Sequence, residues 1–208
     1  MPHSQSVAYF VYKPLYPTMK RPEPFRFMLM LAMFGSGLFF VFCLLIYVLR
    51  KEGSNLVEIP LPRIFWVSTA VMLLSSLTLH TAQWAFRKDK YLIYRMLMGN
   101  TLLLGILFIL MQLMGWQSII NYPQVPEART SVGFIYLISG MHILHILVGL
   151  FFLIKIFIEA LKRLSYVDSF VYSVNPPNQL KINLIVFYWH FVDVLWIVLF
   201  LFLVYQHQ

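Results

Sequence analysis

The sequence predicts an all-α integral membrane protein, folded as a bundle of five transmembrane helices, and three observations support this. Of its 208 residues, 60% are hydrophobic and 12% are charged, against about 45–50% and about 25% in soluble domains. Several windows without a charged residue exceed the roughly 18 residues needed to cross a bilayer. Prolines and charges gather at the ends of these windows, where helices end. Lipid is therefore the expected solvent for most side chains.

Five apolar segments account for the spans, each near the 17–25 residues of a crossing helix. In chain order they lie at about residues 27–49, 64–86, 96–114, 132–154 and 182–205. Basic residues bound them, with Arg26 and Arg50 at the first, Arg87 at the second, Arg95 at the third, Lys155 at the fourth and Lys181 at the fifth. Prolines, among them Pro176 and Pro177, are expected in the connections, because proline interrupts helical hydrogen bonding.

Residues 1–26 form an expected cytoplasmic tail, and residues 27–205 form one transmembrane domain. The tail is rich in proline and has no apolar stretch that could serve as a signal peptide. Lys and Arg concentrate in the tail and in the connections after the second and fourth spans. Since positively charged segments stay in the cytoplasm, the N-terminus is expected inside and the C-terminus outside.

The formal net charge of +8 does not indicate a nucleic-acid partner. The basic residues form short clusters at the ends of apolar segments, and no basic face is interleaved with aromatic side chains. The single cysteine, Cys43, lies inside the first span, which excludes an intramolecular disulfide. It is expected to be a small packing residue.

The informative polar positions lie inside the spans, because an ionisable group at mid-depth costs about 2.5–3.5 kcal/mol. They are His80, His142, His145, His190 and Asp193. At a rise of about 1.5 Å per residue, His80, His145, His190 and Asp193 are expected roughly 9–17 Å from the cytoplasmic ends of their spans, in one candidate polar layer. The depth of His142 is left open.

Two kinds of interpretation remain open for this layer. The groups either pair with one another or with backbone and so hold neighbouring helices together, or they form a proton path or a haem or metal ligand set. We expect no metal bound by this chain, because the sequence offers neither paired cysteines nor paired carboxylates. Catalytic motifs of hydrolases and phosphate-binding glycine loops are missing as well, so no catalysis by the chain alone is expected.

The fifth span carries a specific resemblance. The string Tyr188-Trp189-His190-Phe191-Val192-Asp193-Val194-Leu195-Trp196 closely resembles the C-terminal signature of cytochrome c oxidase subunit III. In the fourth span, Gly140-Met141-His142-Ile143-Leu144-His145, followed by Gly149, is similar to a Gly-x-His-x-x-His stretch of that family. The similarity extends over about residues 27–205 and is closest to the short, five-helix bacterial members.

The resemblance implies an accessory subunit without a redox centre. Such a subunit packs beside the catalytic subunit I of a proton-pumping terminal oxidase, which also contains subunit II, and supports proton uptake during aerobic electron transport. Haem and copper are expected in the partner, and none in this chain. Phospholipid and a respiratory supercomplex are further binding partners that the resemblance allows. The location that it implies is the bacterial cytoplasmic membrane, with the histidines in structural or proton-related roles.

The sequence also departs from the family pattern, and other functions stay open. The first span has no carboxylate where the family commonly has a buried glutamate, and Gly115-Trp116-Gln117 stands where another glutamate often occurs. A quinol oxidase or a nitric oxide reductase would carry a similar subunit. A di-histidine haem b electron carrier is the alternative from a different class.

Overall fold

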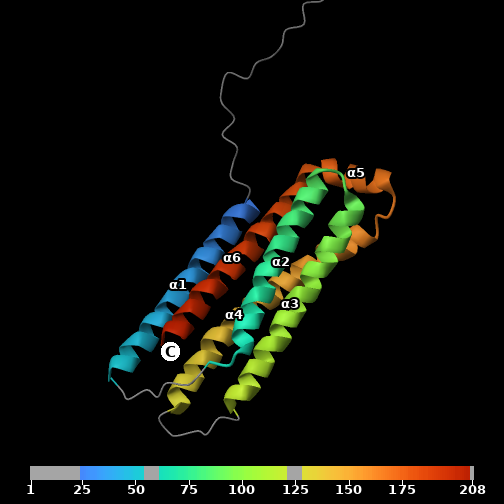
Figure 1. The fold of residues 1–208 in the computed structure, drawn as a ribbon. Helices are drawn as coiled ribbons and strands as arrows, with labels where there is room; N and C mark the ends of the chain where they lie inside the picture. The colour runs from blue at the N-terminus through green and yellow to red at the C-terminus, as the bar shows by residue number, and fades with distance from the viewer. Residues whose placement is uncertain (1–23, 54–60, 121–127, 207–208) are drawn as a thin grey trace, which may run out of the picture.

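The computed structural model describes residues 24–53, 61–120 and 128–206, and the described part is entirely helical. Most of the predicted tail, residues 1–26, lies outside it. The elements are α1 (Pro24–Gly53), α2 (Ile64–Arg87), α3 (Tyr91–Ile120), α4 (Ala128–Leu161), α5 (Tyr166–Val174) and α6 (Pro176–Gln206). All but α5 are long and apolar enough to cross a membrane. The prediction of an all-α bundle with five spans is therefore confirmed (Figure 1).

The helices extend past the predicted spans into the polar ends of the bundle. The largest differences are in α3 (Tyr91–Ile120) and α4 (Ala128–Leu161), and α6 begins at Pro176, before its predicted start at about residue 182. Pro176 and Pro177 thus start a helix, although the sequence analysis assigned them to a connection. The first turn of a helix tolerates proline because its N–H groups have no partner inside the helix.

A three-residue turn, Lys88-Asp89-Lys90, joins α2 to α3. Asp89 has a φ of 56°, the left-handed conformation that often ends a helix. The N–H of Lys90 donates to the carbonyl of Ala85 at 3.0 Å and closes the turn. The two helices therefore run antiparallel in direct contact (Figure 1).

The main core lies between α2, α3, α4 and α6. Its largest fully buried side chains include Trp189 and Trp196 of α6, Phe65 of α2 and Phe108 of α3. In contrast, α1 contacts only α4 and α6 closely, around a small second cluster that includes Phe40. Most of the α1 surface is left exposed.

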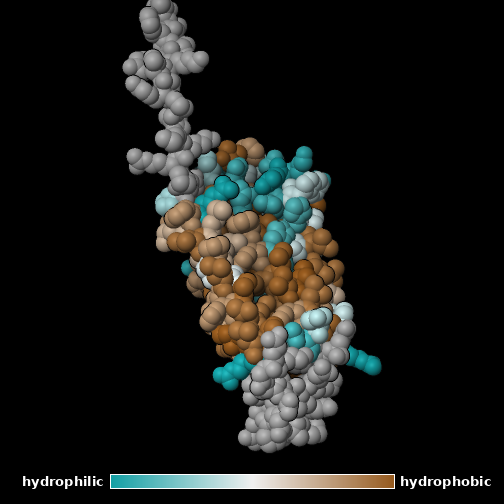
Figure 2. All heavy atoms as spheres, turned by 90° about the vertical axis from the view of Figure 1, so that its left-hand side faces the viewer, coloured by the Kyte–Doolittle hydropathy of each residue, from teal (hydrophilic) through white to brown (hydrophobic). Residues whose placement is uncertain are grey.

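The exposed surface has the apolar character that lipid requires. Figure 2 shows a broad hydrophobic belt on the face that it draws, with hydrophilic residues gathered above it, at the end where α1 begins. The start of α1 and the end of α6 lie at opposite ends of the bundle (Figure 1). This arrangement follows from five consecutive crossings.

The short α5 lies across the end of the bundle that also holds the α2–α3 turn (Figure 1). Its outward side chains are mostly apolar, with Val167 66% and Val171 65% exposed. Asp168 is also exposed, while Ser169 and Ser173 are buried. A helix with this distribution fits the boundary between headgroups and acyl chains. The sequence analysis did not anticipate α5.

Candidate functional site

Four of the polar side chains inside the membrane spans meet where α2 and α6 pack together. We call Ser76, His80, His190 and Asp193 the α2–α6 polar group. Ser76 Oγ and His190 Nδ1 form a hydrogen bond of 2.7 Å. His190 Nδ1 also lies 3.8 Å from Asp193 Oδ2, one turn along the same helix. The rings of His80 and His190 are 5.9 Å apart between centroids.

Asp193 is the most enclosed member of this group. It is 4% exposed, and neither carboxyl oxygen has a hydrogen-bond partner among the described residues. An unsatisfied buried polar group costs about 1–3 kcal/mol, so its presence calls for a reason. The His190 ring is 36% exposed. The pair therefore places an enclosed carboxyl group beside a more accessible imidazole.

His145 takes part in a different contact, between α4 and α1. Its Nδ1 lies 2.7 Å from the carbonyl oxygen of Met141, and its Nε2 lies 2.7 Å from Ser36 Oγ. Because a carbonyl oxygen can only accept, Nδ1 carries the proton, and in the neutral ring Nε2 accepts from the Ser36 hydroxyl. Both ring nitrogens are thus occupied by protein groups. No hydrogen bond or ring contact joins this pair to the α2–α6 polar group within the described residues.

His142 lies apart from the other histidines, in an aromatic setting. It is fully buried, and neither ring nitrogen has a hydrogen-bond partner among the described residues. The ring stacks on Trp196 with centroids 5.0 Å apart and meets the edge of Phe108 at 5.9 Å. Of the predicted layer, the structure thus brings together His80, His190 and Asp193, and it places His145 and His142 elsewhere.

The aromatic residues of the fifth-span signature hold α6 in place. Trp189 Nε1 donates to Ser75 Oγ at 3.1 Å, and Trp196 Nε1 donates to Thr69 Oγ1 at 3.0 Å, both on α2. The hydroxyl of Tyr188 donates to the carbonyl of His145 on α4 at 2.9 Å. These bonds fix the rotation of α6, and with it the direction of His190 and Asp193.

Glycines make room for these rings. A Cβ atom on Gly149 would lie 3.1 Å from both Trp189 and Tyr188, and one on Gly105 would lie 3.1 Å from Trp189. Small residues allow this close approach between membrane helices. Gly140 is different, because a Cβ there would make only an ordinary contact with Trp116, at 3.5 Å.

Sequence reasoning missed a second polar cluster at the end of the bundle near α5. Glu159 of α4 accepts a hydrogen bond from the Tyr172 hydroxyl at 2.8 Å and lies 4.0 Å from Lys181 Nζ. The guanidinium of Arg163 covers the Tyr172 ring at 4.1 Å. Burial, reinforced by the Glu159 carboxylate, raises the pKa of Tyr172 well above its ordinary value. In the sequence, the signal for this cluster was one acidic residue, Glu159, among the basic residues that follow the fourth span.

Ser36 was missed as well. Its only signal was a single hydroxyl between two glycines in an otherwise apolar span, Gly35-Ser36-Gly37. Hydroxyl groups in membrane helices often bond across to a neighbouring helix. Without the rotation of α1, the sequence could not show that His145 is the partner.

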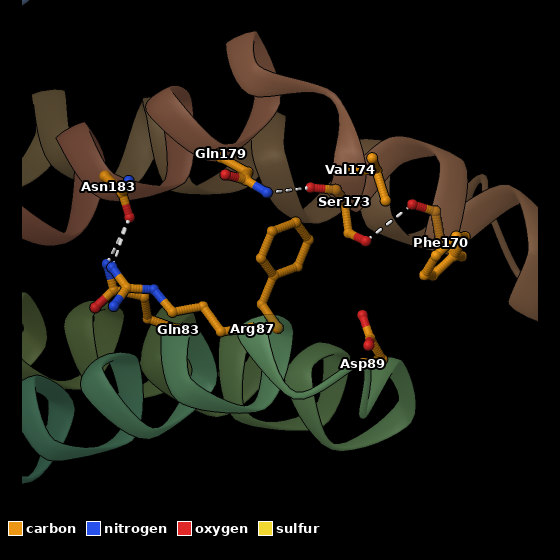
Figure 3. A pocket seen from close by; sticks show the side chains of 9 residues that line it. Gln83, Arg87, Asp89, Phe170, Ser173, Val174, Gln179 and Asn183 are labelled. Carbon is orange, nitrogen blue, oxygen red and sulfur yellow. Dashed lines mark hydrogen bonds between the residues drawn. The ribbon is translucent and has the colours of Figure 1, made fainter.

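A cavity of about 390 Å³ opens near the α2–α3 turn, between α2, α5 and α6. On one side, Gln83 Nε2 and Arg87 Nη2 both donate to Asn183 Oδ1, at 2.8 and 3.1 Å. Asp89 lies at the other end, where it accepts a hydrogen bond from the Tyr91 hydroxyl at 2.7 Å. Figure 3 shows Gln83 and Arg87 reaching from α2 toward Asn183. The cavity is thus lined by these polar groups together with the apolar side chains of Phe86, Phe170 and Val174.

In the described part of the chain, the structure brings together no group of three His, Cys, Asp or Glu side chains that could hold a metal ion. What the arrangement does offer is hydrogen bonding between helices and one enclosed carboxyl-imidazole pair. These are the means to position helices and to exchange protons.

Comparison with known proteins gives a consistent result. The family model described as cytochrome c oxidase subunit III matches residues 25–208. The chain is 27% identical over 150 residues to the probable quinol oxidase subunit 3 of Staphylococcus haemolyticus, which covers 72% of this chain and 69% of that protein. It is 27% identical over 152 residues to the cytochrome c oxidase subunit 3 of Corynebacterium diphtheriae, covering 73% and 68%. Similarity to the Staphylococcus aureus probable quinol oxidase subunit 3 is 26% over 150 residues.

Proposed function

The chain belongs to the cytochrome c oxidase subunit III family, and on this premise we propose that it is an accessory, non-redox subunit of a proton-pumping terminal oxidase of the cytochrome c oxidase type. Its five spans make it a multi-pass membrane protein, and its bacterial relatives indicate the cytoplasmic membrane. In this proposal the chain stabilises the catalytic subunit I, with subunit II in the same complex, and supports proton uptake. Haem and copper belong to those partners.

The observation that carries the proposal is that histidines inside the membrane spans form hydrogen bonds with other groups of the chain. His145 is held by Ser36 and by backbone, and His190 is held by Ser76 beside Asp193. Hydrogen bonds of this kind fix helices in lipid, where no water competes for them. They support a structural role with one proton-exchanging pair. Both hydrogen bonds of His145 would have to break before its ring could bind a haem iron or another metal ion.

Purification from native membranes in mild detergent tests the proposal. We expect the chain to travel with a much larger subunit that has the absorption bands of haem, in a complex that reduces oxygen. Removal of the chain should leave those bands in place while oxygen reduction declines during sustained turnover. A preparation in which the chain never accompanies a haem-bearing subunit refutes the proposal.

A quinol oxidase subunit is the second candidate, and one observation favours it. Several of the similar proteins are named quinol oxidase subunit 3, next to one named cytochrome c oxidase subunit 3. Oxygen consumption by the purified complex with reduced cytochrome c, compared with consumption with a quinol, separates the two. Activity with quinol alone would replace the cytochrome c oxidase proposal by this one.

A further inference from the structure

One face of α2 and α6 carries a continuous line of polar side chains through the membrane-embedded part of the bundle. This α2–α6 stripe consists of Ser76, His80, Gln83 and Arg87 on α2, with Asn183 and His190 on α6. The four α2 positions recur at helical spacing, so they share one side of the helix. His80, Arg87 and Asn183 are exposed, and the other three are half-buried. The stripe therefore reaches the outer surface of the chain.

The chain does not satisfy the donors of its own stripe. Among the described residues, His80 makes a ring contact with His190 but no hydrogen bond. In the part of the chain that the structure describes, Arg87 donates to the amide oxygen of Asn183, which Gln83 shares. The nearest carboxylate along the chain, Asp89, is engaged by Tyr91. The exposed part of the stripe thus presents basic groups and donors, and it lacks an acceptor of matching charge.

Depth decides between lipid and protein as the missing partner. Positions 80 and 87 are about 10 Å apart along α2, so His80 lies well inside the acyl region when Arg87 lies at the headgroups. Acyl chains offer no hydrogen-bond acceptor, and polar side chains at such depth face protein or a water-filled cavity. A lipid phosphate could pair with Arg87 alone. Only a protein segment can serve both levels.

We propose that the α2–α6 stripe is the docking surface for a transmembrane segment of the haem-bearing subunit of the oxidase, and that this segment carries acceptors at two levels. One acceptor, a hydroxyl, carbonyl or carboxyl oxygen, faces His80 within the membrane. The other is a carboxylate at the membrane edge, where the cavity of about 390 Å³ beside Arg87 has room for an acidic side chain. This inference rests on the proposed function, because it assigns the surface through which the subunit joins the complex.

Photocrosslinking in the intact complex tests the location directly. Phe187, close to the stripe on α6, is replaced by benzoylphenylalanine, and Phe152 on α4 receives the same replacement as a control. Both phenylalanines are 50% exposed. After irradiation of native membranes, we expect position 187 to yield a covalent adduct with the haem-bearing subunit, and position 152 to yield much less. An adduct only with lipid or with a second copy of this chain at position 187 overturns the proposal.

Substitutions test the chemistry. His80→Leu and Arg87→Gln should each lower the amount of this chain recovered per haem-bearing subunit by about 3- to 20-fold, the effect of one intramembrane hydrogen bond. Asn100→Leu, which makes the change from polar to apolar at an exposed position of α3, should leave the recovery unchanged. Circular dichroism of each isolated variant verifies that its helices have formed.

The possible results separate this inference from the proposed function. If the unaltered chain co-purifies with the haem-bearing subunit and the His80 and Arg87 variants do so equally well, the docking surface is elsewhere and the proposed function stands. If the unaltered chain itself does not co-purify, the proposed function fails and this inference fails with it.

Discussion

Removal of the Ser36 hydroxyl should loosen α1 from the rest of the bundle. The hydroxyl donates to His145 Nε2 at 2.7 Å and so joins a side chain of α1 to one of α4. In Ser36→Ala, the imidazole nitrogen loses its partner in a surrounding that offers no water. Side-chain hydrogen bonds between membrane helices contribute about 0.6 kcal/mol on average and up to about 1.7 kcal/mol. The docking equilibrium of α1 should therefore weaken about 3- to 20-fold.

The small contact surface of α1 makes this bond matter more than it would elsewhere. Its fully buried apolar side chains are few, chiefly Phe40 and Tyr47, and most of its remaining surface is exposed. Few other contacts are present to compensate for the loss. We expect Ser36→Ala to affect α1 more than the core of α2, α3, α4 and α6.

A double-mutant cycle measures the effect. Unfolding in mixed detergent micelles is followed for Ser36→Ala, for His145→Leu and for both together, and the departure from additivity gives the coupling energy. Ser118→Ala is the matched control, because the Ser118 hydroxyl donates only to the Met114 carbonyl of its own helix, at 3.1 Å. A coupling energy of zero for the Ser36 and His145 pair would refute the reasoning.

Further predictions concern the other contacts. In the complex, Asp193→Asn should slow proton uptake and leave the optical spectrum of the haems unchanged; a changed spectrum would place the carboxyl group near a cofactor. Trp189→Phe removes the bond to Ser75 and part of a fully buried ring, and should destabilise the chain by about 1–3 kcal/mol in micelle unfolding; unchanged unfolding would contradict this. Folding raises the pKa of Tyr172. Its contribution to the stability of the folded chain is therefore complete below the ordinary tyrosine pKa of about 10. The contribution declines as the pH rises above that value, because the tyrosine ionises first in the unfolded state. Absorbance titration should show one late-ionising tyrosine fewer in Tyr172→Phe than in the unaltered chain, and an unchanged number of late-ionising tyrosines would contradict the assignment.

Hydropathy predicted the spans well because lipid exposure imposes a length and a composition on each crossing helix. It did not predict where the helices end. An apolar window stops at the first charge, whereas a helix continues into the headgroup region, where a side chain such as Arg95 finds polar partners, here the Arg163 carbonyl and the Ser169 hydroxyl. The short α5 escaped for a related reason. Its nine residues are too few for a span, and Ser169 and Ser173 face the protein.

Side-chain partners were harder to predict than depth. The depths estimated from the sequence put His80 and His190 at similar levels, and in the structure their ring centroids are 5.9 Å apart. Depth says nothing about rotation around the helix axis, however. His145 has a depth like theirs but faces Ser36 on α1. His142 packs on Trp196, a contact that is visible only once α6 is fixed by its indole hydrogen bonds.

The tight turn at Lys88-Asp89-Lys90 has a consequence for biosynthesis. Of the five spans, α2 has the lowest hydropathy, since it carries hydroxyl and imidazole groups. Such a segment partitions poorly from the translocation channel into lipid by itself. The turn delivers α3 directly beside it, and the Gln112 amide of α3 donates to Ser68 of α2 at 3.0 Å. The two helices can thus leave the channel as one hairpin, in which α3 supplies the apolar surface that α2 lacks.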